Sequence, residues 1–492
     1  MAQASGSSAE IWYKIEQANG VTPSVDSGAS TTLASAVNPG AASIVVASDS
    51  GIAAGDILRV GNSQNMEFVK VDAGYVSGTT VTLDTNTKIN YRHESGEDVK
   101  ETDPTQNWFK LGNVRSFTPS GGRELQRSQA LSGSRVLSNF REGNYDAGAD
   151  MTVELDIETA GLFYLHALNN DYYSAGATQP SSPVSTTLAN AADKGDTQIE
   201  VASATNMDTG VFLLIGTGTG AEIVKVGTYT SGTTIDLDPD AHPFGLRKSH
   251  ANGVAVVEKI KPFTHTIYRG STIPEGISIL LRFTDIESLM LIRGNKISNL
   301  TLSVDPSDLP QLNMNVVGKA FQILSENIFG TPTAISNTPY VHWEADVQVD
   351  GSPLTSNQLE NLSLVIENTI QGNFVVGSPI KGAITPGEGS VSGSFTYQFG
   401  SQQFSEKTIA GTETQLDFIW TYIGDDNHQV TLSVPKAKFE GSPHPGVGSK
   451  DPITDEKSFL GRLDTGSSPE TDITVTVKNT QPTVEFMVEA SA

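Results

Sequence analysis

A stretch of alternating apolar and polar residues occurs twice in this chain, with different sequence around each copy. The first copy reads EFVKVDAGYVSGTTVTLD from Glu67, and the second reads EIVKVGTYTSGTTIDLD from Glu222. Alternation with a period of two is typical of a β-strand that buries one face, and Ser-Gly pairs between such runs are typical of turns. Each copy therefore predicts a small all-β unit.

The similarity extends beyond this stretch, over residues 31–103 in the first copy and 186–261 in the second. Early in the copies, matching residues lie 155 positions apart, as Gly55 and Gly210 do. Two copies are too few for a solenoid, in which at least three repeats must stack to bury a core. We therefore interpret the copies as two small β modules inserted into a larger host chain.

The composition favours an all-β protein and excludes several kinds of site. The 492 residues include 47 Gly and 23 Pro, and the apolar runs have the length of strands. At roughly 100–200 residues per domain, a chain of this length has room for three or four domains. It contains no cysteine, which excludes disulfides, thiolate zinc sites and a cysteine nucleophile.

The chain is strongly acidic, with 56 Asp and Glu against 31 Lys and Arg and a formal net charge of −25. Nucleic-acid binding through a basic surface is disfavoured, because affinity for phosphate needs clustered Lys and Arg. An acidic surface also suits a salty environment, so a halophilic source is one alternative.

No targeting segment or membrane span is expected. The N-terminal sequence MAQASGSSAEIWYK lacks a charged segment followed by an apolar run, so it does not resemble a secretory signal. The longest apolar candidate, ISILLRFTDIESLMLI, is interrupted by charges and is too short to span a membrane. We expect a soluble protein that is made in the cytoplasm and has no membrane partner.

Outside the modules, about 340 residues alternate mainly like strands. The clearest helix is predicted over 157–170, where Leu162, Leu165 and Leu168 share one face. A shorter helix is predicted around Asp285, in the sequence DIESLMLI.

The order of the host elements occurs twice. In the first half, REGNYDAGADMTVELD leads into a helix, GISILLRF and KISNLTLSVD. In the second half, KGAITPGEGSVSGSFTYQF leads into a polar segment, ETQLDFIWTYIG, DNHQVTLSVPKAKFEG and DITVTVKN. We therefore expect two related sheet domains in the host chain.

Several host motifs resemble, in order and spacing, the tail tube proteins of long-tailed phages and archaeal viruses, in the class with two tandem tube domains. The motifs are GVTPS, the loop 123–141, GNYDAGADMTVELD, HTIYRG with GISILLRF, GNKISNLTLSVDPSDLPQLNMNVVGKAF, and SLVIEN, GSVSGSFTYQF and HQVTLSVPKA near the end. The two inserted modules depart from the family pattern. In a tube protein such inserts are expected on the outer surface.

This resemblance implies a fold and a function. Each tube domain would be a β-sandwich flanked by a helix, and neighbouring sheets would join into a barrel around a channel. Three chains with two domains each would close a homotrimeric ring with pseudo-sixfold symmetry, and stacked rings would form the hollow tail tube for DNA delivery. Ring closure by head-to-tail contacts also removes exposed sheet edges.

The resemblance also implies the partners and the location. The partners would be further copies of the chain, a tape-measure protein, tail terminator and tip proteins, and double-stranded DNA that passes through the lumen without specific binding. The protein would lie in the virion tail. We expect a neutral or acidic lumen, because it would repel phosphate, and the candidate lining strands are 299–318 and 428–441 with 472–479.

The sequence thus predicts an all-β fold with one or two short helices, divided into four parts. These parts are a discontinuous first tube domain, two inserted modules and a second tube domain. Their residues are 1–30 with 104–179 and 262–325, then 31–103 and 180–261, and then 326–492.

Five arginines lie within 27 residues of this otherwise acidic chain: Arg115, Arg123, Arg127, Arg135 and Arg141. The polar stretch between them predicts a long loop. Arginine is well suited to bidentate pairing with carboxylates across a contact. We predict that these residues help to join subunits or rings, the alternative being a solvent-exposed hairpin.

No catalytic constellation, cofactor site or metal site is predicted. The eight histidines lack ligand spacing within one element, no G-x-S-x-G elbow occurs, and GTGTGAE at Gly216 precedes a strand where a phosphate loop would precede a helix. The acidic stretches at Gly96, Asp236 and Asp464 are interpreted as solvated turns. A structural calcium or sodium ion in a module turn is the alternative.

Two other functions are compatible with the sequence. A modular surface adhesin or S-layer-like glycan-binding protein would also be acidic, β-rich and free of cysteine, but it would normally carry an export signal and aromatic clusters for sugar stacking. A β-rich hydrolase would need paired carboxylates or an activated nucleophile. Neither set of features is evident, so we favour a non-enzymatic tube protein.

Overall fold

The computed structural model is built mainly from β-strands, as the sequence predicts, with helices α1 (Ala160–Leu168) and α2 (Gln403–Ala410). The structure describes residues 5–61, 65–127, 140–168, 172–271, 273–335, 338–354, 359–425, 427–446 and 452–485. The predicted all-β fold with short helices is confirmed. Within the described residues, no helix is long and apolar enough to cross a membrane.

A first sheet unit contains two connected antiparallel layers. One layer has the order β9-β10-β20-β19, and the N-terminal half of the long strand β19 continues into a second layer with β18 and β21, where β1 pairs with β18. The strands are β1 (Ala9–Ile15), β9 (Val114–Arg127), β10 (Phe140–Glu154), β18 (Ile277–Phe283), β19 (Ser288–Val304), β20 (Gln311–Gly318) and β21 (Ala320–Leu324), with β8 (Phe109–Lys110) and β22 (Thr333–Ala334) beside β1.

A second sheet unit has the same strand order. One layer runs β25-β28-β31-β30, and the N-terminal half of β30 continues into a layer with β29 and β32, where β23 pairs with β29. The strands are β23 (Ala345–Val349), β24 (Ser352–Pro353), β25 (Leu359–Glu367), β28 (Ser390–Gln398), β29 (Thr414–Thr421), β30 (Gln429–Glu440), β31 (Thr454–Gly461) and β32 (Thr474–Asn479), with the hairpin β26 (Gln371–Phe374) and β27 (Lys381–Thr385) between β25 and β28.

The helices only partly follow the sequence prediction. The helix predicted over 157–170 is α1, but the helix predicted around Asp285 is wrong, because Ser288 begins β19. Glu287 has a φ of 47° in the tight turn between β18 and β19, which ends any helical path there. Helix α2 lies in the polar segment and was not predicted, since it buries only Phe404 and Ser405.

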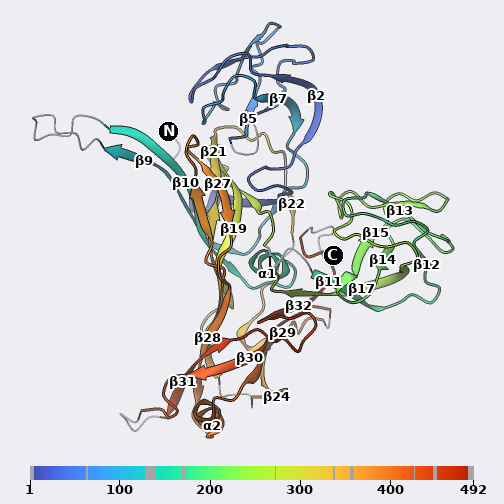
Figure 1. Ribbon diagram of the computed structural model, residues 1–492, viewed down its shortest axis with the longest axis vertical. Coiled ribbons are helices and arrows are strands. Elements are labelled where there is room, and N and C mark those ends of the chain that lie inside the picture. Colours follow the sequence, from blue (N-terminus) through green and yellow to red (C-terminus); the bar gives the residue numbers. More distant parts are fainter. Residues whose placement is uncertain are drawn as a thin grey trace, which may run out of the picture.

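The two inserted segments share one topology. The first has the order β2-β7-β4-β5 with a separate β3–β6 pair, and the second has β12-β17-β14-β15 with β13–β16. The strands are β2 (Val25–Thr32), β3 (Ser43–Val45), β4 (Ile57–Val60), β5 (Glu67–Lys70), β6 (Thr80–Thr82), β7 (Asp98–Asp103), β12 (Ser185–Thr187), β13 (Gln198–Glu200), β14 (Phe212–Ile215), β15 (Glu222–Lys225), β16 (Thr234–Asp236) and β17 (Ala255–Tyr268). Each segment has its own apolar core, and Figure 1 shows both outside the long central sheet. We call them the first and second modules; the boundaries of the four predicted parts stay predictions.

A buried glutamate–histidine pair also recurs in the two modules. In the first module, His93 Nε2 lies 3.0 Å from a Glu67 carboxylate oxygen, and this carboxylate accepts hydrogen bonds from backbone N–H groups of the loop that carries the histidine. In the second module, His250 Nε2 lies 2.6 Å from Glu222, which accepts equivalent backbone bonds. Each glutamate thus fixes the same loop, because a buried carboxylate must be paired.

The modules are attached to the host in different ways. Strand β17 leaves the second module and pairs with β11 (Tyr172–Thr178) and β32 of the host. The first module packs Phe68 into an apolar cluster with Trp12 and Trp108 of the host. The Gln322 side chain on β21 accepts the Phe68 backbone N–H at 3.1 Å and donates to its carbonyl at 2.6 Å, as a neighbouring strand would.

Phe68→Ala should destabilise the attachment of the first module, because it removes a fully buried ring from the shared cluster. We expect a loss of about 3–5 kcal/mol in the free energy of unfolding, measured by denaturant titration. Val76→Ala is the control, since Val76 is 89% exposed and should change stability by less than about 0.5 kcal/mol. Equal effects of the two substitutions would contradict this packing.

Candidate tube-forming surfaces

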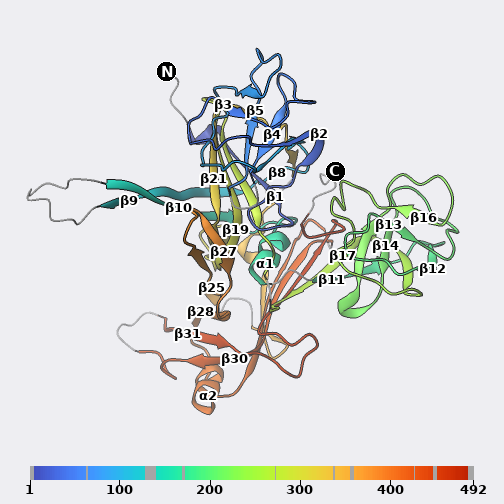
Figure 2. The same ribbon diagram turned by 45° about the horizontal axis from the view of Figure 1, so that its top comes forward.

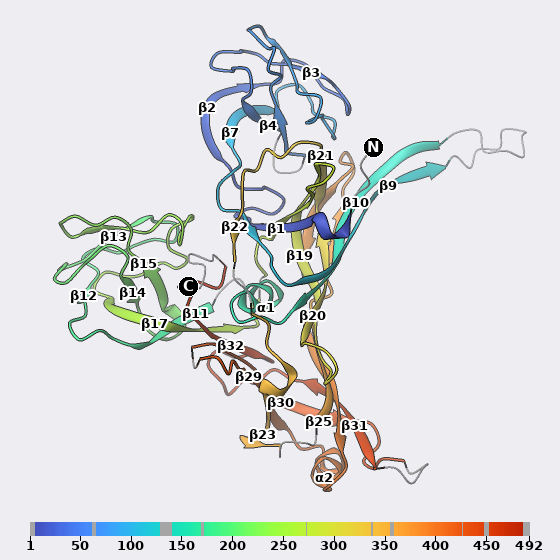
Figure 3. The same cartoon turned by 180° about the vertical axis from the view of Figure 1, so that it is seen from behind.

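The two sheet units are joined into one sheet by a ladder between β19 and β25. This ladder runs from Asn299 opposite Glu367 to Val304 opposite Leu362. The strands β9-β10-β20-β19-β25-β28-β31-β30 therefore form an uninterrupted sheet along the long axis of the molecule, with α1 to one side of it (Figures 1 and 3).

One face of this joined sheet is apolar and buried. A row across the strands contains Met151, Met314, Leu300, Ile366 and Val391, each opposite the next, and each is at most 3% exposed. Helix α1 packs on this face against β19. The face belongs to the main hydrophobic core, so the opposite face of the same strands is left to solvent.

The opposite face, which we call the polar face, carries mainly hydroxyl and amide side chains. Thr152 Oγ1 donates to Asn313 Oδ1 at 2.9 Å, and Asn313 Nδ2 donates to Ser303 Oγ at 3.2 Å, so neighbouring strands are also linked through their side chains. In strand order, the rows are Thr118, Asp150, Asn315, Asn299, Glu367 and Ser390; then Ser116, Thr152, Asn313, Thr301, Val365, Ser392, Leu460 and Lys438; then Glu154, Gln311, Ser303, Ser363, Ser394, Ser458 and Glu440.

The charges on the polar face are mostly acidic. Asp150, Glu154, Glu367, Glu440 and Glu456 lie on it, and the basic side chains there are Lys438 and Arg115. Arg115 is paired within the chain, with Glu154 at 3.0 Å and Asp308 at 2.5 Å, and its hydrogen bonds hold the pKa of Asp308 below the usual value. The face therefore offers no free basic cluster among the described residues.

Strands favoured by the sequence as a channel lining fall into two groups. Strands β19 and β20 and the last residues of β30 contribute to the polar face. Strand β32 does not, because it pairs with the N-terminal half of β30 and with β17 in the other layer.

The joined sheet has an unpaired strand edge at each end. In the part of the chain that the structure describes, β9 pairs with β10 alone, and residues 438–440 of β30 pair with β31 alone. Pro119 lies within β9, and a proline is tolerated in a strand mainly at an edge, where its missing N–H leaves no ladder bond unmade. Both edges are available to a further strand.

The five arginines do not form one cluster. Arg123 makes an ion pair with Glu142, and its guanidinium lies 4.6 Å from the ring centre of Tyr145. Arg127 and Arg141 are exposed near the far end of the β9–β10 hairpin, which extends away from the body of the molecule (Figure 2). Arg135 lies outside the described residues. A role of all five in subunit contacts stays a prediction.

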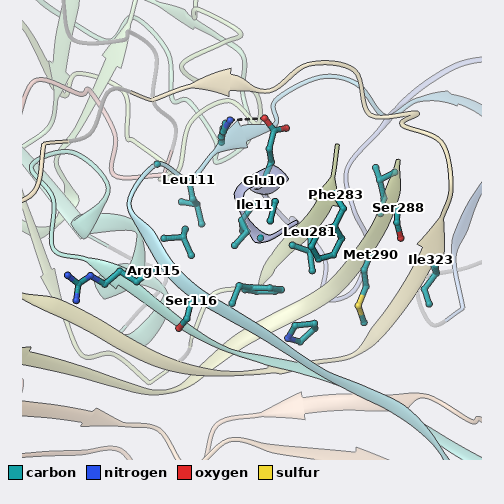
Figure 4. Close-up of a pocket in the computed structure, with 18 residues that line it drawn as sticks. Glu10, Ile11, Leu111, Arg115, Ser116, Leu281, Phe283, Ser288, Met290 and Ile323 are labelled. Atoms are coloured by element: carbon teal, nitrogen blue, oxygen red, sulfur yellow. Dashed lines mark hydrogen bonds and ion pairs between the residues drawn. The ribbon is translucent and has the colours of Figure 1, made fainter. Parts of the chain in front are cut away.

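An apolar cleft of about 580 Å³ lies beside the unpaired edge of β9. Leu281, Met290 and Ile323 contribute side chains to it from β18, β19 and β21, as Figure 4 shows, and Phe117 of β9 lines it as well. This cleft was not predicted from the sequence. Its residues come from strands far apart in the chain, and each fits an ordinary strand pattern.

The segment that leads into α1 makes a buried polar contact with the second sheet unit. Glu158 Oε1 lies 3.0 Å from His428 Nε2 and accepts a hydrogen bond from Thr480 Oγ1 at 2.9 Å. Burial by itself lowers the pKa of His428, but hydrogen bonds to Glu158 and Asp425 outweigh it and raise this pKa above its usual value. The contact thus favours the protonated histidine.

Because the pKa of His428 is raised in the folded state, the stabilisation is fully present below the unfolded pKa of about 6.5 and is lost as the pH rises through the folded pKa. The difference in Tm between the native protein and His428→Gln should therefore be larger at pH 6 than at pH 9. Calorimetry at the two pH values measures it. A difference that grows towards pH 9 would contradict this pairing.

Among the described residues, no group of three or more His, Asp or Glu side chains is placed to hold a metal ion. His242 accepts the backbone N–H of Lys225 at 2.9 Å, which is a structural role. The GTGTGAE sequence forms a short turn at Gly218–Gly220 and continues into strand β15, so it lacks the helix of a phosphate loop.

A joined sheet with one solvent-exposed polar face and two unpaired edges is suited to assembly with further copies of itself. A family model described as phage tail tube protein matches residues 6–477. The chain therefore belongs to the phage tail tube protein family. Comparison with curated proteins gave no significant match.

Membership of this family defines the role in outline. The protein is a structural component of the virion tail and self-assembles into the tail tube with other tail proteins. The family implies a structural role and no enzymatic one, in agreement with the sequence prediction.

Proposed function

We propose that three copies of this chain close into a ring by edge-to-edge strand pairing, and that stacked rings form the hollow tube through which double-stranded DNA is ejected. The polar face would line the lumen. The observation that supports this proposal is the β19–β25 ladder, which joins the last strand of the layer β9-β10-β20-β19 in the first unit to the first strand of the layer β25-β28-β31-β30 in the second. Because the units have the same strand order, β30 can pair with β9 of a neighbouring copy in the same way.

The register of this contact follows from the repeat. Across the first unit, Thr118, Asp150, Asn315 and Asn299 form one row. The matching row across the second unit is Ser363, Ser394, Ser458 and Glu440. Glu440 therefore occupies the position in β30 that Asn299 occupies in β19.

Within the chain, Asn299 is opposite Glu367, which lies four residues after Ser363 in β25. The residue four positions after Thr118 in β9 is Gly122. Repetition of the internal ladder thus places Glu440 of one copy opposite Gly122 of the next. Such head-to-tail contacts close into rings and leave no free sheet edge.

The number of copies follows from the unit count and the family resemblance. Each chain supplies two sheet units, so three chains give the six pseudo-equivalent positions expected of a tube ring. Cyclic closure satisfies both unpaired edges of every chain without a second kind of contact.

The composition of the polar face suits the passage of DNA. Its hydroxyl and amide groups are hydrogen-bonded to one another, and its net charge is acidic, so phosphate groups would gain no counterion release by binding to it. The second module lies on the same side of the sheet as α1, away from the polar face (Figures 1 and 3), which supports an outer position for it.

The type of virus and the partner proteins are also part of the proposal. The order of motifs supports a long-tailed phage or archaeal virus with two tube domains per chain. A tape-measure protein and the tail terminator and tip proteins would contact the tube. Family membership counts against the adhesin and S-layer alternatives.

Cysteine pairs test the ring contact directly, because the chain has no cysteine of its own. A side chain at Gly122 would meet no neighbouring atom within 4 Å. In the double variant Gly122→Cys with Glu440→Cys, a short thiol cross-linker should give covalent dimers and trimers and no larger species, measured on denaturing gels.

The matched control is Ser116→Cys with Glu440→Cys. Ser116 is on the same strand and face, but it is six residues from Gly122, or about 20 Å at the rise of a strand. Equal cross-linking of the control, or a ladder that continues beyond trimers, would refute the proposed ring.

The exposed arginines of the β9–β10 hairpin give a separate test. Arg127→Ala with Arg141→Ala should shorten tubes or reduce their number without changing the Tm of the unassembled protein, because neither side chain is buried. Each lost ion pair would cost about 0.2–1 kcal/mol, repeated at every copy. Electron microscopy measures tube length, and Arg92→Ala on the first module is the control. Tubes of native length would remove these two arginines from the assembly contacts.

A further inference from the structure

The strongest unexplained feature is the apolar cleft beside β9, and the repeat indicates what covers it. Helix α1 belongs to the first unit by its position in the chain, yet it also packs against β25 and β32 of the second unit. A side chain placed at Gly161 would lie 3.6 Å from Val477 on β32, and Asn368 donates a hydrogen bond to the Ala167 carbonyl at 2.7 Å. Helix α1 thus covers a surface of the second unit.

That surface contains three apolar side chains in register across three strands. Phe418 on β29 is opposite Leu432 on β30, which is opposite Val475 on β32. Each of them is fully buried in the main core, with 0% exposure.

The first unit has the same three positions without such a cover. Leu281 on β18 is opposite Met290 on β19, which is opposite Ile323 on β21. All three line the cleft (Figure 4), and Ile323 is 52% exposed. Ile323 and its counterpart Val475 differ in exposure because α1 covers the surface of the second unit and leaves that of the first unit open.

We propose that the cleft beside β9 binds helix α2 of the neighbouring copy, as the second unit binds α1 within the chain. This proposal rests on the ring closure proposed above and assigns that contact a second, apolar element. Helix α2 packs on β30, as α1 packs on β19, so pairing of β30 with β9 of the next copy brings α2 to the cleft of that copy.

The exposed face of α2 fits this role. Ile409 is 71% exposed on a helix whose buried residues, Phe404 and Ser405, face its own sheet. Gln402 lies seven residues before Ile409, two helical turns back along the same face. An exposed isoleucine opposite the exposed Ile323 gives both side chains an apolar environment.

A polar contact also has a counterpart. Glu158 lies four residues after the end of β10, and Gln402 lies four residues after the end of β28. Between copies, the position that the charged Glu158 occupies within the chain would thus be taken by the uncharged Gln402.

The register between copies is tested by Ile409→Cys with Ile323→Cys. The two side chains of one chain lie in different sheet units, so a thiol cross-linker should produce covalent dimers and trimers. Val76→Cys with Ile323→Cys is the control and should remain monomeric, since Val76 lies on the first module. Equal cross-linking of the control would refute the assignment.

The two cysteine pairs distinguish a failure of the proposed α2 contact from a failure of the proposed ring. If Gly122→Cys with Glu440→Cys gives trimers while Ile409→Cys with Ile323→Cys does not, the ring stands and the α2 contact is wrong. If neither pair cross-links, both proposals fall.

A single substitution gives an independent measurement. Ile409→Asp places a charge in the proposed apolar contact and should weaken association of copies at least about tenfold in sedimentation experiments. Val76→Asp, at a valine that is 89% exposed on the first module, should leave association unchanged. The Tm of each unassembled variant should match that of the native protein, and native-like assembly of Ile409→Asp would overturn the proposal.

Discussion

The β19–β25 ladder is the contact on which the rest of the structure depends. A strand edge exposes backbone N–H and C=O groups, and this ladder satisfies the edges of two sheet units against each other within one chain. It also fixes the register across both units, so that polar side chains fall on one face and the core on the other. In the described part of the chain, strand β9 and the end of β30 each still have one unpaired edge. Assembly is therefore expected at these two strands.

The positions of the inserted modules follow from this constraint. The first module enters between β1 and β9, and the second between α1 and β18, so neither interrupts a ladder of the joined sheet. Each module brings its own core and its own buried glutamate–histidine pair. A segment with its own core can be added at a connection without changing the strand register on either side.

The Glu158–His428 contact within the chain is charged, whereas the proposed α2 contact between copies is neutral, and this difference has a physical reason. Glu158 and His428 are buried together permanently, so the cost of removing them from water arises once, during folding. Copies that must first be stable apart would expose and then bury any charged pair at each assembly step. The neutral amide of Gln402 at the position of Glu158, with Ile409 on the same helix face, reduces that cost.

The local alternation of residues was enough to predict the all-β class, most strands, α1 and the repeated order of elements, because strand and helix periods are properties of neighbouring residues. The local pattern gave the wrong secondary structure where tertiary contacts determine it. In DIESLMLI, a tight turn at Glu287 is followed by β19, which pairs with β18, so no helix forms there. Helix α2 was not recognised because it buries too few apolar side chains. The arginines could be counted in the sequence, but the structure separated them, since pairing with Glu154 or Glu142 depends on cross-strand register. Only the tertiary structure determined the cleft formed by Leu281, Met290 and Ile323, because these residues lie on three different strands. Each of them fits an ordinary strand pattern, so the cleft becomes apparent only when the first sheet unit is compared with the second, where α1 covers the equivalent surface.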